Sequence, residues 1–159
     1  MKILSILPLV LIAGCSELGI LMPPPILEND PPTTTPVTFD PTPAPAPSPL
    51  ARTVEQFDTT TSQDRAEAVV VRDSAGGQTL GGTIASLGAP TEPGIWLATP
   101  LVNELAQGQV TNVANGNSIN IELRPNGKPS GAGSQISLAA MRLLDAPLTS
   151  LLELRVIRN

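Results

Sequence analysis

Apolar and polar residues alternate in short runs along the second half of the chain, and the clearest run is Ser118–Leu123. A two-residue period is typical of a β-strand with one face on a core, because successive side chains of a strand point to opposite faces. The pattern predicts a strand whose core face carries Ile119, Ile121 and Leu123 and whose solvent face carries Ser118, Asn120 and Glu122. The preceding dipeptide Asn115-Gly116 is typical of a hairpin turn, so we expect Gln109–Val113 to pair with this strand.

The other regular elements are predicted to be short. Two helices are expected, Thr61–Val69 with Thr61 or Ser62 as its cap and Leu138–Leu144 with Ser137 as its cap. The remaining strands are expected at Thr83–Leu87, Gly94–Ala98, Gln135–Leu138 and Leu152–Ile157. Many short strands with one or two short helices predict a mainly β domain built as a small β-barrel.

The N-terminus has the layout of a secretory signal. Lys2 is followed by an apolar run from Ile3 to Ile12, about half the roughly 20 residues that a membrane-spanning helix needs. Next come Ala13, Gly14 and Cys15, a sequence that resembles the lipobox of bacterial lipoproteins. The resemblance implies cleavage between Gly14 and Cys15, leaving 1–14 as the signal peptide, and lipid on the Cys15 thiol.

A proline-rich stretch separates this cysteine from the rest of the chain. Proline fixes φ and lacks an N–H, so the prolines between Met22 and Pro49 stop helix and sheet from propagating. We expect 15–51 to be a disordered, semi-rigid linker, with a sugar-bearing stalk as the alternative. Residues 52–80 are then a short helix and lead-in, and 81–159 the β-barrel domain.

Composition narrows the chemistry. The formal charge is −5, histidine is absent, aromatic residues make up 2%, and Cys15 is the only cysteine. No basic stripe indicates a nucleic-acid partner, and no histidine is present to act as a catalytic base. A metal site would have to use carboxylates and carbonyls alone, so we expect no metal and no other cofactor.

The segment Gly108–Pro125 resembles the centre of the rare lipoprotein A-like double-psi β-barrel family. There, a strand ending in Thr-Asn and an Asn-Gly turn lead into an alternating strand. Gln135–Leu144 and Leu152–Ile157 are similar to the strand, alanine-rich helix and final strand that close the family's fold. The resemblance spans Gly82–Ile157. It implies a double-psi β-barrel in the bacterial cell envelope and, for the peptidoglycan-cleaving members, lytic transglycosylase activity that depends on acidic residues.

The departures from the family pattern concern the catalytic positions. Pro125 stands where the family has its key aspartate, and Ser137 replaces a second aspartate before the helix. Glu92, Glu104 and Glu122 remain as candidate acids, since glycosidic cleavage uses a pair of carboxyl groups. Each has a simpler interpretation as a solvated surface residue, so we expect no catalytic residue and a barrel that has lost its activity.

Two other features each have a structural and a functional interpretation. The glycine-rich stretch Gly127–Gly133 lacks the spacing of a phosphate loop and is expected to be a barrel loop rather than a nucleotide cradle. Trp96 is expected to pack at the core or rim, with a sugar contact as the alternative.

The expected function is that of a non-catalytic lipoprotein, anchored by Cys15 and facing the periplasm from the outer membrane. It would present its barrel to peptidoglycan or to an envelope protein. A lytic transglycosylase with rearranged acids is one alternative. A sugar-acid dehydratase is another, because the chain also resembles small bacterial lipoproteins carried under the name D-galactarate dehydratase. That enzyme family is iron-dependent, and no residues of this chain suggest an iron site.

Overall fold

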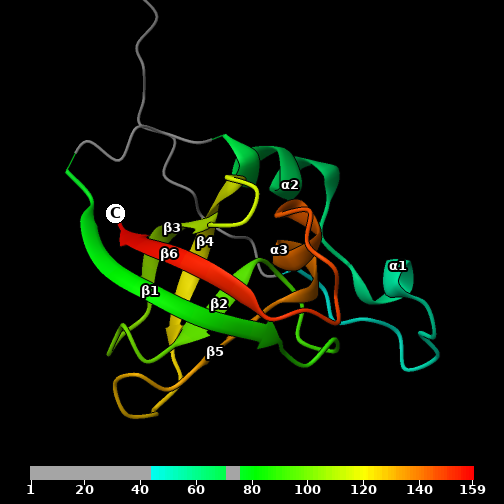
Figure 1. Cartoon of the computed structure of the whole chain (residues 1–159). Helices are drawn as coiled ribbons and strands as arrows, with labels where there is room; N and C mark the ends of the chain where they lie inside the picture. The colour runs from blue at the N-terminus through cyan, green and yellow to red at the C-terminus, as the bar shows by residue number, and fades with distance from the viewer. Residues whose placement is uncertain (1–43, 71–75) are drawn as a thin grey trace, which may run out of the picture. The chain divides into compact units, whose positions relative to one another are not determined.

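Six strands close into a single barrel, in the order β1-β5-β2-β4-β3-β6 (Figure 1). The computed structural model describes residues 44–70 and 76–159. The predicted signal peptide, Cys15 and most of the predicted linker therefore lie outside the described residues. The strands are β1 (Gln78–Leu87), β2 (Trp96–Thr99), β3 (Ala106–Asn112), β4 (Ser118–Pro125), β5 (Ser134–Ile136) and β6 (Leu152–Arg158). The helices are α1 (Val54–Phe57), α2 (Ser62–Val69) and α3 (Leu138–Leu143). The expected mainly β class and the barrel are confirmed.

The barrel mixes two kinds of pairing. β1 with β5 and β2 with β4 run parallel, and the other four neighbouring pairs are antiparallel. Parallel neighbours cannot be joined by a tight hairpin, so the chain must cross over between them. None of the helices in residues 44–70 and 76–159 is long and apolar enough to cross a membrane.

The alternation in β4 produces the core face that the sequence predicts. Ile119, Ile121 and Leu123 are fully buried and belong to one cluster with residues from all the other strands. α3 adds Ala140 and Met141 to the same cluster. Burying a large aliphatic side chain is worth about 1.5–3 kcal/mol, so this cluster is the main source of stability.

The opposite face of β4 differs from the expectation. Asn120 was predicted to meet solvent, but only 8% of it is exposed. Its Nδ2 donates hydrogen bonds to the carbonyl oxygens of Val70 (2.7 Å) and Glu67 (3.4 Å), at the C-terminal end of α2. The prediction was wrong because α2 packs against β4, a contact that the local pattern of β4 does not encode.

The hairpin predicted at Asn115-Gly116 is present between β3 and β4. The amide of Gly116 donates to the Asn112 carbonyl oxygen (2.8 Å), and the Asn112 amide donates to the Asn117 carbonyl oxygen (2.9 Å). Gly116 has a φ of +79°, which glycine adopts without steric penalty. The turn therefore follows directly from local sequence chemistry.

The predicted helix caps are also present. Thr61 caps α2 by accepting from the Asp64 amide at 3.1 Å, and Ser137 caps α3 by accepting from the Ala140 amide at 3.3 Å. Because Ser137 begins the helical turn, β5 ends at Ile136, before the expected strand end at Leu138. β1 starts at Gln78, earlier than the expected Thr83.

Candidate functional site

Pro125 is the last residue of β4 and the position where the resemblance puts the family's catalytic aspartate. It is exposed and pairs with Thr99, the last residue of β2. The next residue, Asn126, donates from its amide to the Thr99 carbonyl oxygen (3.3 Å) and from Nδ2 to the Gly133 carbonyl oxygen (3.2 Å). These bonds hold the two ends of the 126–133 loop next to the end of β2.

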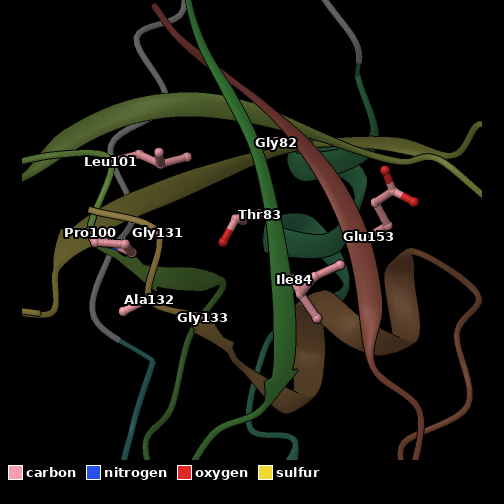
Figure 2. A pocket seen from close by; sticks show the side chains of 9 residues that line it. All are labelled: Gly82, Thr83, Ile84, Pro100, Leu101, Gly131, Ala132, Gly133 and Glu153. Carbon is pink, nitrogen blue, oxygen red and sulfur yellow. The ribbon is translucent and has the colours of Figure 1, made fainter. Parts of the chain in front are cut away.

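A pocket of about 420 Å³ lies beside this loop. Its walls come from β1, the start of the β2–β3 connection, the glycine-rich loop and β6 (Figure 2). The lining residues are Gly82, Thr83, Ile84, Pro100, Leu101, Gly131, Ala132, Gly133 and Glu153. The sequence analysis identified the glycine-rich loop as a barrel loop, and the structure adds that it forms one wall of a pocket.

Thr83 provides the one hydroxyl group of the pocket lining, on the β1 side. Thr83 Oγ1 and Ser134 Oγ are 2.7 Å apart and share a hydrogen bond, and Ser134 is buried. Figure 2 shows the Thr83 hydroxyl on the same side of β1 as Gly131, Ala132 and Gly133. The Glu153 carboxylate lies on the other side of β1 in that view. The pocket lining therefore contains one hydroxyl, that of Thr83, and one carboxylate, that of Glu153, rather than a pair of facing carboxylates.

The three candidate acids do not line this pocket. Glu104 is largely exposed, and its Oε1 accepts from Arg158 Nη2 at 2.7 Å. Glu122 on β4 pairs with Arg124 of the same strand, and its side chain is 20% exposed rather than fully solvated. Glu92 is exposed in the loop before β2. Two of the three candidate acids thus form an ion pair with an arginine, and the third faces solvent.

Trp96 packs against the outside of the barrel, and 2% of it is exposed. The Arg124 guanidinium lies 5.2 Å from the ring centroid, and the indole Nε1 donates to the Glu92 carbonyl oxygen at 3.4 Å. Gly88 lies so close that a Cβ there would be 2.6 Å from Cη2 of the ring. The expected packing role is confirmed, and the covered ring leaves no face for a sugar.

Ser137 is the position at which the resemblance would put a second aspartate. Besides capping α3, its Oγ accepts from the Trp96 amide at 3.1 Å, and the Ser137 amide donates to the Trp96 carbonyl oxygen at 3.0 Å. Ser137 is completely buried. Its contacts join β2 to the start of α3, which is a structural role.

Sequence reasoning missed two arrangements. One is the hydroxyl pair of Thr83 and Ser134, which are 51 positions apart in the chain. The other is the Asp58 carboxylate, which accepts from Arg142 Nη1 at 2.8 Å across 84 positions. Neither has a local sequence signal, because only the tertiary fold brings the partners together. Within residues 44–70 and 76–159, no three acidic, histidine or cysteine side chains are grouped to hold a metal ion.

No family model, curated protein or solved structure matches this chain.

Proposed function

We propose that this chain is a lipid-anchored cell-envelope protein that presents its barrel to peptidoglycan or to another envelope protein without cleaving glycan. In this proposal the signal peptide is removed after Gly14 and Cys15 carries the lipid. The proline-rich segment then spaces the barrel from the outer membrane, on the periplasmic side. Several acyl chains, each buried methylene contributing about 0.8 kcal/mol, make such an anchor long-lived.

The observation that carries the non-catalytic part is the environment of Pro125. It ends β4 beside the pocket loop, where the resemblance requires an acid, and proline has no proton to give. General acid catalysis needs an ionisable group within hydrogen-bond reach of the leaving oxygen. Glu104 and Glu122, two of the three candidate acids, are each paired with an arginine.

We also propose that the barrel has the double-psi topology. A closed barrel of six strands with two parallel pairs needs crossover connections, and the double-psi fold is one way to build them. The family resemblance covers the strands that make this barrel.

The anchor is tested by expressing the chain and its Cys15→Ser variant in a bacterium with two membranes, fed a labelled fatty acid. We expect the unaltered chain to carry the label and to be recovered with the outer membrane. The Cys15→Ser variant should carry no label and should not be recovered with that membrane. An unaltered chain without label, or one found in the soluble fraction, would contradict the proposal.

The binding role is tested by incubating the full chain with purified sacculi and by cross-linking it in cells. Retention on sacculi or a recurrent envelope partner is expected. Denuded glycan strands incubated with the same protein should yield no anhydro-sugar product. If product forms and is lost in Glu92→Gln, Glu104→Gln or Glu122→Gln, the chain is a lytic transglycosylase with rearranged acids.

A further inference from the structure

The sequence contains the dipeptide Asn-Gly twice, at Asn115-Gly116 and at Asn126-Gly127. In this dipeptide the backbone nitrogen of the glycine can attack the asparagine side chain, because glycine has no side chain of its own to block the approach. The first copy forms the turn between β3 and β4, and the second begins the glycine-rich loop. The same chemistry can therefore be compared at two places in one molecule.

Both asparagine side chains fold back on their own turn in the same way. Asn115 Oδ1 accepts from the Asn117 amide at 3.0 Å, and Asn126 Oδ1 accepts from the Lys128 amide at 3.0 Å. In each case a donor already faces the oxygen that gains negative charge when the side-chain carbonyl carbon is attacked. This hydrogen bond does not distinguish the two positions.

The attacking backbone nitrogens do differ. The Gly116 amide donates to the Asn112 carbonyl oxygen at 2.8 Å. Gly127 is exposed, and its amide donates no hydrogen bond within residues 44–70 and 76–159. A backbone nitrogen must lose its proton before it attacks a carbonyl carbon, and a hydrogen-bonded amide does so only when its bond opens. The Gly127 nitrogen is therefore available in the folded chain, whereas that of Gly116 becomes available only when the hairpin opens.

The side-chain nitrogens that would leave differ in the same direction. Nδ2 of Asn115 donates to the carbonyl oxygens of Leu144 at 2.8 Å and Asp145 at 3.4 Å. Nδ2 of Asn126 donates to the Gly133 carbonyl oxygen at 3.2 Å. Exposure alone would favour Asn115, which is exposed, over Asn126, which is half-buried. The hydrogen bonds point the other way and hold Asn115 more firmly.

We propose that Asn126 is a site of spontaneous deamidation and that Asn115, in the same dipeptide, is protected. The Gly127 nitrogen bonds to Cγ of Asn126, and the side-chain nitrogen takes up the displaced proton and leaves as ammonia, which closes a cyclic imide. Water then adds to one of the two imide carbonyl carbons and breaks its bond to the ring nitrogen, which regains a proton. The product is aspartate or isoaspartate, with one more negative charge. Water is the only co-reactant, and the inference is independent of the proposed function.

Deamidation would act on the pocket through one hydrogen bond. The bond from Asn126 Nδ2 to the Gly133 carbonyl oxygen joins the two ends of the glycine-rich loop. In the aspartate product an oxygen that can only accept takes the place of this donor and repels the Gly133 carbonyl oxygen. Gly131, Ala132 and Gly133 line the pocket. We therefore expect deamidation to loosen this wall of the pocket.

The test incubates the full chain, purified in detergent, at neutral pH in water enriched in oxygen-18. A glutamate-specific protease then cleaves after Glu122, which puts Asn115 and Asn126 in different peptides, and mass spectrometry measures the label at each site. Label should enter at Asn126 at least about tenfold faster than at Asn115. This ratio corresponds to about 1.4 kcal/mol for opening the Gly116 hydrogen bond.

Two controls separate the fold from the local sequence. In the chain unfolded by urea, Asn115 and Asn126 should react at similar rates, because the hydrogen bonds that distinguish them are lost. Asn126→Gln keeps a side-chain amide but lengthens the side chain by one methylene, which slows ring closure. This variant should lose the label at position 126 and keep the slow rate at Asn115.

The effect on the pocket is tested with Asn126→Asp, which reproduces the aspartate product. The Ala132 amide donates to the Pro129 carbonyl oxygen at 3.1 Å, so its hydrogen exchange reports on the order of the loop. Exchange of the Ala132 amide should accelerate in Asn126→Asp. Asn103→Asp adds the same charge at an exposed position outside the pocket lining and should leave this exchange unchanged.

Equal labelling of Asn115 and Asn126 in the folded chain would overturn the proposal. So would an unlabelled Asn126 over a time in which the unfolded chain reacts at both sites. Unchanged exchange of the Ala132 amide in Asn126→Asp would overturn the effect on the pocket. None of these measurements depends on lipid at Cys15 or on an envelope partner, so their failure and the failure of the proposed function can be distinguished.

Discussion

The carboxylate of Asp58 accepts a hydrogen bond from Arg142 Nη1 at 2.8 Å and joins the segment before the barrel to α3. Only 2% of the Asp58 side chain is exposed. Its other oxygen accepts from the hydroxyl and, at 3.3 Å, from the amide of Thr60, and Arg65 Nη1 lies 4.0 Å from Oδ2. The ion pair and the Asn120 bonds to α2 attach the lead-in residues to the barrel at two places.

Asp58→Asn should destabilise the protein by about 2 kcal/mol, because the Arg142 bond loses its charge assistance and a buried acceptor is lost. The free energy of unfolding, measured in urea, checks this. Glu104→Gln is the control: the Glu104 side chain is 68% exposed in its pair with Arg158, so its loss should cost under about 0.5 kcal/mol. Equal effects of the two substitutions would show that the Asp58 pair contributes no more than a surface pair.

Gly108→Ala should cost more than about 2 kcal/mol, since it forces an atom into a filled site. A Cβ there would overlap the Ile157 carbonyl oxygen and lie 2.6 Å from Leu123 Cδ1. Gly82→Ala, whose Cβ would meet only ordinary contact at 3.7 Å, should change stability little. Thermal unfolding of the two variants makes the comparison, and a stable Gly108→Ala would mean that β3 and β6 separate easily.

Ser137→Ala should destabilise the protein by about 2 kcal/mol, because one buried oxygen accepts from both the Ala140 and the Trp96 amides. The exposed cap Thr61 serves as the comparison. It accepts from the Asp64 amide alone, so Thr61→Ala should cost about 1 kcal/mol or less. Urea midpoints measure both, and a larger loss for Thr61→Ala would contradict the structural role given to Ser137.

Asn120→Leu should loosen α2 while leaving the barrel folded. The substitution removes the donor that holds the Val70 and Glu67 carbonyl oxygens. Amide exchange within Ser62–Val69 should accelerate, while exchange in β3 and β6 stays slow. Asn103→Leu, at an exposed loop position, should have neither effect. Unchanged exchange in α2 would show that other contacts suffice to hold the helix.

Local chemistry explains why part of the fold was predictable. The apolar face of β4, the Asn115-Gly116 turn and the Ser137 cap depend on residues a few positions apart, and all three appear in the structure as expected. The length of β1 was underestimated. Its first half contains Gly81 and Gly82, which weaken any strand pattern, and this half is a strand because β6 pairs with it.

The candidate site was predictable only in outline. Pro125 and the loop after it were identified from the sequence, and the structure places that loop against a pocket. The walls of the pocket come from β1, the β2–β3 connection and β6, which no local pattern brings together. Which side chains face the pocket depends on the strand order around the barrel.

The sequence by itself determined the turn at Asn115-Gly116, which face of β4 is apolar, and that Pro125 offers no acid. Only the tertiary structure decided that Asn120 is buried, that Asp58 meets Arg142, and that the glycine-rich loop lines a pocket with β1. The physical reason is the separation along the chain of the residues that interact. Strand period, turns and caps arise from neighbouring residues, whereas the burial of polar groups and the walls of the pocket arise from which distant segments pack together.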